Sequence, residues 1–135
     1  MGLGLVFALP MQLLGLARTQ AGLLGTFYFA AVWVLGEWFR GWFLTGFPWL
    51  YLGYGMIDTW LAGWLPIFGA LGVSLVTALS AALCSQIPGT LRASETKVLV
   101  YASAKLMLIA ALWSGGYLLQ TLRWTTEADS TIQVS

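Results

Sequence analysis

The chain has 135 residues, of which 59% are hydrophobic and 8% are charged, and its formal net charge is +1. A soluble domain of this size has too little interior to bury so much apolar surface, so the composition excludes an ordinary soluble domain and predicts a membrane protein. The small net charge gives no reason to expect nucleic acid as a partner, and the lack of histidine removes the commonest metal ligand.

Four apolar segments approach the length of about 20 residues that a helix needs to cross a bilayer. They are predicted at about Met1–Ala17, Ala21–Gly36, Leu65–Cys84 and Val98–Leu119. Helices are expected because an open sheet edge in lipid would leave backbone groups unpaired. The predicted fold class is therefore an all-α membrane protein with about four transmembrane helices in residues 1–119. Its first helix begins at Met1, which suggests a chain that starts inside a span or is truncated, and Pro10 is expected to kink it.

Lysine and arginine in short loops favour the cytoplasmic side of a membrane. Arg18 lies between the first two predicted helices, and Arg92 and Lys97 lie between the last two. Two spans separate these loops, so both are expected to face the cytoplasm. The loop of residues 37–64 and the tail of residues 120–135 are then predicted to face outward.

One face of the third predicted helix carries small residues at every fourth position, which are Ala70, Ser74, Ala78 and Ala82. Positions four apart share a helix face, and small side chains let another helix approach closely. The pattern favours a packing face, although alanine and serine are common in any span.

Lys105 lies eight residues into the fourth predicted helix. A charge at that depth is expensive and can mark a functional site. The side chain can also extend its aliphatic stem towards the cytoplasmic surface, and this is the interpretation that we favour.

The loop after the second helix is long and aromatic, and from Glu37 it reads EWFRGWFLTGFPWLYLGYGMIDTWLAGWLP. Tryptophan and tyrosine favour the headgroup level of a membrane. The residues expected there are Trp38, Trp42, Trp49, Tyr51, Tyr54, Trp60 and Trp64. Pro48 stiffens the chain and biases Phe47 away from helix, so TGFPWL predicts a turn that presents Trp49. The loop is therefore predicted to be re-entrant or interfacial.

Glu37 and Arg40 are three residues apart, so on a helix end they would share a face and could pair. One interpretation is a structural clamp that fixes the loop on the second helix, because desolvated charges persist when they are paired and hydrogen-bonded. The other is that Arg40 also receives an anionic phospholipid headgroup, since guanidinium binds phosphate as a two-pronged donor. The physical argument favours the clamp. Asp58 is interpreted as a turn or helix-cap residue.

The run from Gly36 to Ser74 resembles the membrane part of apolipoprotein N-acyltransferase, through the motif E-x-x-R-G-W-x-x-T-G-F-P-W-L-x-x-G-Y. TIQVS at Thr131–Ser135 resembles the first strand of that family's periplasmic nitrilase-like domain. The resemblance implies a bacterial inner-membrane enzyme that moves an acyl chain from phospholipid to the α-amino group of the N-terminal diacylglyceryl-cysteine of a lipoprotein. It also implies eight spans, of which this chain would hold the fourth to the seventh. Residues 120–135 would then be the linker and first strand of a truncated nitrilase-like domain, and the loop would be periplasmic.

The resemblance assigns the catalytic Glu, Lys and Cys to that outer domain, so no catalytic residue is expected in this chain. Cys84, Glu37 and Lys105 match none of the three. The candidate substrate-binding residues are Trp49, Arg40, Glu37, Trp42, Phe47 and Tyr54. Trp49 matches a family tryptophan at the mouth of the active site. No cofactor and no metal are expected.

The sequence thus predicts the membrane part of a lipoprotein N-acyltransferase, inactive alone, that supplies the anchor and the lipid entrance. Its expected partners are a phospholipid acyl donor, a diacylglyceryl-lipoprotein acceptor, the membrane, and the remaining helices and periplasmic domain of the parent protein. One alternative is a small transporter or channel subunit, although only Lys105 approaches the polar midplane residue that transport sites need. Another is a non-catalytic membrane scaffold assembled through the small face of the third helix.

Overall fold

The computed structural model describes residues 22–43, 46, 48–92 and 98–124, together with Gly4, Ala8, Gln12, Leu13 and Gly15. The side chains of residues 48 and 90–92 are not described. Several sequence predictions lie outside the described residues: most of the first helix, Arg18, Phe47, Lys97 and the strand expected at Thr131–Ser135.

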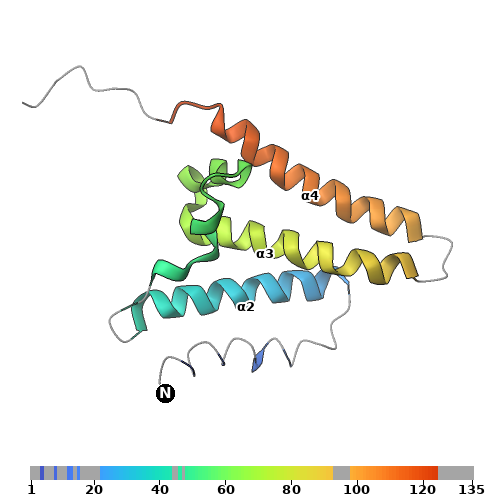
Figure 1. Cartoon of the computed structure of the whole chain (residues 1–135), viewed down its shortest axis with the longest axis horizontal. Coiled ribbons are helices and arrows are strands. Elements are labelled where there is room, and N and C mark those ends of the chain that lie inside the picture. The colour runs from blue at the N-terminus through green and yellow to red at the C-terminus, as the bar shows by residue number, and fades with distance from the viewer. Residues whose placement is uncertain are drawn as a thin grey trace, which may run out of the picture.

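Three long helices dominate the described chain from residue 22 onward: α2 (Leu23–Trp42), α3 (Leu65–Arg92) and α4 (Val98–Gln120). Figure 1 shows them side by side, with α3 between α2 and α4. Three short 3-10 helices, η3 (Pro48–Leu50), η4 (Leu52–Met56) and η5 (Trp60–Trp64), form the connection from α2 to α3. This connection lies at the end of the molecule where α2 and α4 finish and α3 begins (Figure 1). The all-helical prediction is confirmed for the described residues.

Two stretches of the described chain are long and apolar enough to cross a membrane. One is Trp60–Gly89, which covers η5 and most of α3, and the other is Val98–Gln120, which is α4. The searched residues give no such stretch in α2, whose last turns carry Glu37 and Arg40. Membrane helices are therefore supported, and the expected total of four spans stays a prediction.

The helix α2 continues past its expected end near Gly36, so Glu37 and Arg40 lie on helix and not in the loop. The continuation has a physical reason, because no proline interrupts this region and its aromatic side chains stack along the helix. Phe39 stacks on Phe43 with ring centroids 4.5 Å apart. The chain turns away only at Phe43, which has an extended backbone, and at Gly46, whose φ of 82° suits glycine.

The helix α3 begins at Leu65 as expected but runs on to Arg92, beyond the predicted end at Cys84. A kink at Gly69, which has φ 65° and ψ −172°, separates its first turn from the rest of the helix. The bounds of α4 match the prediction to within one residue, since it ends at Gln120 where Leu119 was expected.

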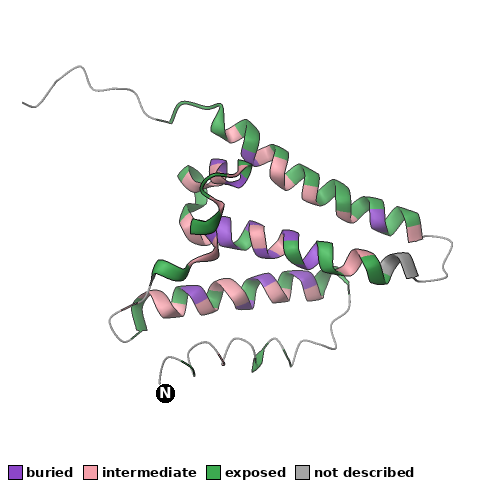
Figure 2. Cartoon of the chain, in the orientation of Figure 1, coloured by how far each residue is buried: buried purple, intermediate pink, exposed green. Residues whose placement is uncertain are grey.

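The core of the molecule lies where the loop meets α3 and α4. Leu61 of η5 and Val73 of α3 are fully buried, and Val76 joins them. Trp64 and Trp113 pack against this cluster from the edges. Figure 2 shows buried positions on the facing sides of α2 and α3 and on η5, whereas α4 is mostly exposed. Burying one large apolar side chain stabilises a fold by about 1.5–3 kcal/mol, so the cluster attaches the loop firmly to the helices.

The predicted small face of α3 is buried at three of its four positions, since Ser74, Ala78 and Ala82 are buried and Ala70 is half-buried. The loop uses part of this face, because Gly53 of η4 lies against the backbone of Ala70. The face therefore serves packing within the chain, as the spacing of small residues predicts.

The helices α2 and α3 are also tied at the end away from the loop. Gln86 Nε2 of α3 donates to the hydroxyl of Thr26 on α2 at 2.6 Å. That hydroxyl in turn donates to the carbonyl of Gly22 at 3.2 Å. These contacts tie α2 to α3 at the end of the helix pair that lies away from the loop.

Candidate functional site

One polar attachment of the loop is the carboxylate of Glu37. The side chain is 1% exposed, and its Oε1 accepts hydrogen bonds from Trp33 Nε1 at 3.0 Å and from the amide of Leu52 at 2.7 Å. Its Oε2 is also buried and has no hydrogen-bond partner among the described residues. A buried carboxylate is costly unless donors surround it, so Glu37 tightly fixes the backbone of η4 against α2.

Arg40 makes the second attachment, one turn further along α2. Its Nη2 donates to the carbonyl of Leu50 at 3.1 Å. Leu50 follows Trp49 directly, so the guanidinium lies beside the backbone that carries the predicted tryptophan. Glu37 and Arg40 thus each bind loop backbone, as a clamp between α2 and the loop would require.

The helix α3 holds the residue after Leu52. The amide of Gly53 donates to the hydroxyl oxygen of Ser74 at 2.8 Å, and both residues are buried. Any side chain at position 53 would overlap the carbonyl oxygen of Ala70. Two consecutive amides of η4 are therefore bound by two different helices, one by Glu37 and one by Ser74.

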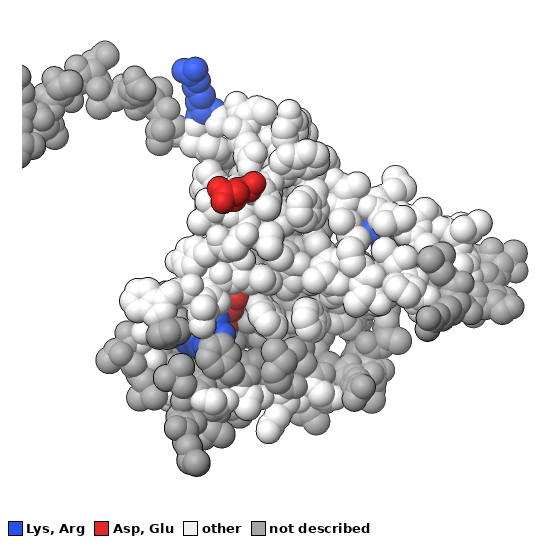
Figure 3. All heavy atoms as spheres, in the orientation of Figure 1, with Lys and Arg blue, Asp and Glu red and all other residues white. Residues whose placement is uncertain are grey.

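The loop projects its aromatic side chains outward from these attachments. Trp49 is 67% exposed and Tyr54 is 44% exposed, and Trp42 at the end of α2 is 55% exposed. Tyr51 is half-buried, with its hydroxyl against Gly41 of α2, and stacks on Tyr54 with ring centroids 5.5 Å apart. Figure 3 shows few charged side chains on the visible face. The loop thus combines a fixed backbone with an apolar, aromatic surface.

The structure brings together some of the predicted site residues and separates another. Glu37 and Arg40 meet the loop on either side of Tyr51, through Leu52 and Leu50. Trp42 instead packs at the end of α2, with its ring 5.5 Å from that of Trp38. Phe47 lies outside the described residues.

Two contributors to the attachment were not predicted as site residues. Ser74 was predicted only as a small packing residue, and its role as acceptor depends on where η4 folds. Trp33, which donates to Glu37, lies four residues earlier on α2. That spacing is the only sequence signal that could have found it, because residues four apart share a helix face.

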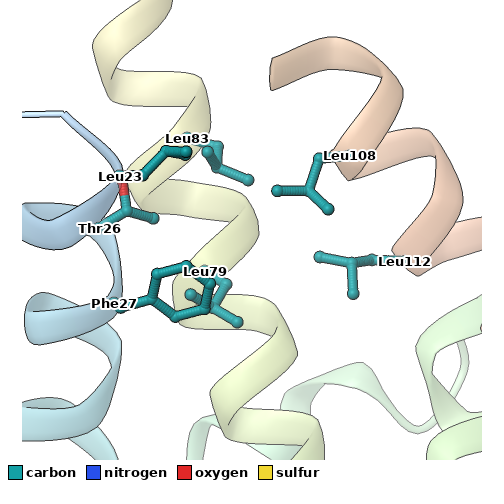
Figure 4. A pocket seen from close by; sticks show the side chains of 7 residues that line it. All are labelled: Leu23, Thr26, Phe27, Leu79, Leu83, Leu108 and Leu112. Carbon is teal, nitrogen blue, oxygen red and sulfur yellow. The ribbon is translucent and has the colours of Figure 1, made fainter. Parts of the chain in front are cut away.

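A separate apolar cavity of about 110 Å³ lies between α2, α3 and α4. Figure 4 shows the side chains that line it: Leu23, Thr26, Phe27, Leu79, Leu83, Leu108 and Leu112. Its one hydroxyl, on Thr26, is already bonded to Gly22 and Gln86. A cavity without available polar groups cannot orient a polar substrate, so the loop is the better candidate site.

The sequence profile described as the apolipoprotein N-acyltransferase N-terminal domain matches residues 1–83, which include α2, the whole loop and most of α3. The chain belongs to the apolipoprotein N-acyltransferase family. The resemblance drawn from the motif beginning at Glu37 is thereby confirmed.

Individual members of the apolipoprotein N-acyltransferase family match over nearly the whole chain. The Azotobacter vinelandii protein is 40% identical over 137 residues, which cover 100% of this chain and 26% of that protein. The Pseudomonas putida protein is 41% identical over 131 residues, 96% of this chain and 25% of its own length. The Coxiella burnetii protein is 34% identical over 117 residues, 87% of this chain and 23% of its own length. The chain thus spans about a quarter of the length of these relatives.

Proposed function

We propose that this chain is the membrane part of a bacterial enzyme that transfers an acyl chain from a phospholipid to the α-amino group of a diacylglyceryl-cysteine at the N-terminus of a lipoprotein. In this transfer an ester bond of the phospholipid breaks, an amide bond forms on the amine, and a lysophospholipid leaves. The catalytic Glu, Lys and Cys belong to a periplasmic domain of the parent protein. This chain anchors that domain in the inner membrane and forms the entrance for the acyl donor.

The observation that carries the proposal is the exposed indole of Trp49 directly before a backbone carbonyl that α2 holds. Trp49 is 67% exposed, and its neighbour Leu50 is held by Arg40. An exposed aromatic ring on a mobile loop would be of little use for guiding a substrate, because ordering it would cost entropy. A ring on a fixed backbone is preorganised.

The side chains of the loop suit the two parts of a phospholipid acyl donor, its fatty chain and its headgroup. A phospholipid must rise partly out of the leaflet towards a nucleophile that lies in water. Flat aromatic side chains can shelter the fatty chain during that step, because their faces are apolar and their polar edges tolerate water. Arg40 lies at the same level of the loop, and guanidinium is suited to phosphate, so we assign the headgroup to Arg40.

A chimera tests the proposal. Residues 1–135 replace the matching quarter of the Azotobacter vinelandii relative, and the purified chimera is assayed for acyl transfer from phospholipid to a diacylglyceryl peptide. We expect an active chimera, whereas the chain alone transfers nothing because it carries no catalytic group. Transfer by the isolated chain would contradict the assignment of chemistry to the outer domain.

Substitution of Trp49 by alanine in the chimera should lower turnover about tenfold or more, since a missing guide misplaces the acyl donor. Trp38→Ala is the matched control, because Trp38 is also an exposed tryptophan, at 52%, but lies on α2 outside the loop. The two rates are compared at equal amounts of folded protein. Equal rates for both variants would show that Trp49 only sits at the headgroup level, as other tryptophans do, and does not guide the acyl donor.

A further inference from the structure

The last segment of the loop, η5, packs along one face of the C-terminal half of α4. Leu112, Gly116 and Gln120 lie four residues apart on that face and meet successive parts of the segment. Trp64 Nε1 donates to the carbonyl of Leu112 at 3.0 Å. Gln120 Nε2 donates to the carbonyl of Thr59 at 2.7 Å. We call residues 59–64 with residues 112–120 the η5–α4 interface.

Two glycines bring the backbones together at the centre of the η5–α4 interface. A Cβ added to Gly63 would overlap the carbonyl oxygen of Gly116, and a Cβ added to Gly116 would overlap the carbonyl oxygen of Trp60. Both glycines are buried. Small residues allow backbones to approach this closely at helix interfaces in membranes. At such distances Cα–H···O contacts can form between the two backbones. Each glycine thus lies against a backbone carbonyl of the other element, and neither position has room for a side chain.

The η5–α4 interface completes a bridge across the three helices. Glu37 of α2 holds η4 through the amide of Leu52, Ser74 of α3 holds the next amide, and α4 holds η5. The chain leaves α4 at Thr121, directly after the glutamine that binds η5. Figure 1 shows this exit at the same end of the molecule as the loop. The exit and the aromatic loop are therefore held in one arrangement.

We propose that the η5–α4 interface positions the acyl-donor entrance relative to whatever part of the protein follows α4, with Gly63, Gly116 and Gln120 as positioning residues. This inference rests on the proposed function, because it assumes that the acyl donor passes the loop and that the chemistry lies beyond the exit from α4. Misplacement of reacting groups by about 1 Å can cost up to about a hundredfold in rate. The close backbone contact at Gly63 and Gly116, with the hydrogen bonds of Trp64 and Gln120 on either side, would keep that distance constant.

A distance measurement on the full chain tests the interface itself. Spin labels are attached at Asp58→Cys in the loop and Arg123→Cys after α4, in a Cys84→Ser background, with the protein in phospholipid vesicles. Both labelled positions are exposed. In Gly116→Ala we expect a longer and broader distribution of distances, since the new Cβ must push η5 from α4. Gly55→Ala is the matched control, because a Cβ at Gly55 meets nothing within 4 Å.

Circular dichroism shows whether each variant keeps its helices. An unchanged distance in a folded Gly116→Ala variant overturns the inference. If that variant does not fold, Gln120→Leu decides, because Gln120 is exposed and its loss removes a donor without adding a backbone clash. We expect a broader distribution in Gln120→Leu, and an unchanged one would overturn the inference.

The chimera with the Azotobacter vinelandii relative tests the positioning role. We expect Gly116→Ala to lower kcat about tenfold or more while KM for the phospholipid changes by less than about twofold, since the acyl donor still binds but is misplaced. Gly55→Ala should leave both constants unchanged. A shifted distance with unchanged kcat would make the interface structural only and overturn the inference. An inactive unmutated chimera would contradict the proposed function and this inference with it, whereas the distances would still show whether the interface is rigid.

Discussion

Glu37 accepts two hydrogen bonds through one carboxylate oxygen, from the indole of Trp33 and from the amide of Leu52. The first donor lies on the same helix and the second lies fifteen residues later in the loop. A buried donor that loses its acceptor costs about 1–3 kcal/mol. At the scale of single residues, the position of the loop therefore depends on this oxygen and on the contact of Arg40 with Leu50.

Replacing Glu37 by alanine should lower the free energy of unfolding by about 1–3 kcal/mol, because the amide of Leu52 and the indole of Trp33 lose their acceptor. Glu37→Gln keeps an acceptor oxygen of the same size at the same place, so we expect a loss below about 1 kcal/mol. Denaturant unfolding in detergent micelles, followed by circular dichroism, measures both. Equal losses in the two variants would show that the charge and not the acceptor matters.

Sequence spacing predicted part of this residue-scale arrangement. It indicated that Glu37 and Arg40 share a helix face and hold the loop, because positions three apart on a helix lie together. It could not identify Leu50 and Leu52 as their partners. Those partners are backbone groups, which every residue carries, and their position depends on how the whole loop folds.

The loop is the element that joins the three helices, and glycine decides how closely it packs. Gly53 lies against the backbone of Ala70 without room for a Cβ, whereas Gly55 in the same 3-10 helix has nothing within 4 Å of that position. The two glycines are therefore a matched pair in one short segment. Only the first is expected to be needed for packing.

Gly53→Ala should destabilise the chain by about 1–3 kcal/mol, since the new methyl group overpacks a rigid backbone contact. Gly55→Ala should change the free energy of unfolding by no more than about 0.5 kcal/mol. Thermal unfolding of both variants in the same detergent checks this difference. An equally stable Gly53→Ala variant would mean that the loop can move off α3, against the close packing described above.

At the scale of elements, apolar length predicted α4 almost to the residue and the beginning of α3 at Leu65. The extension of α2 to Trp42 was not predicted, because charged residues in an apolar pattern suggested a loop, whereas aromatic stacking and the contacts of Glu37 keep the segment helical. The three 3-10 helices were also not predicted. The positions of η4 and η5 depend on contacts of Gly53 with α3 and of Gly63 with α4, which are far away in the sequence.

The whole molecule has the dimensions of a membrane-embedded unit with its loop at one end. The part of α3 that follows the kink at Gly69, residues 70–92, spans about 35 Å at 1.5 Å per residue, and the hydrocarbon core of a bilayer is about 30 Å thick. Since the loop and the end of α3 lie at opposite ends (Figure 1), a membrane crossed by α3 separates them. The sequence could predict which side is which only from the few lysine and arginine residues in the short loops.

The proposed function requires the aromatic loop to lie at the outer face of the membrane, where the acyl donor enters. Cysteine labelling in spheroplasts tests it, with a membrane-impermeant maleimide and a Cys84→Ser background. Asp58→Cys reports on the loop, and Gly89→Cys reports on the far end of α3, where an added side chain meets nothing within 4 Å. We expect labelling of Asp58→Cys in intact spheroplasts and of Gly89→Cys only after permeabilisation. The opposite pattern would place Trp49 in the cytosol and contradict the account.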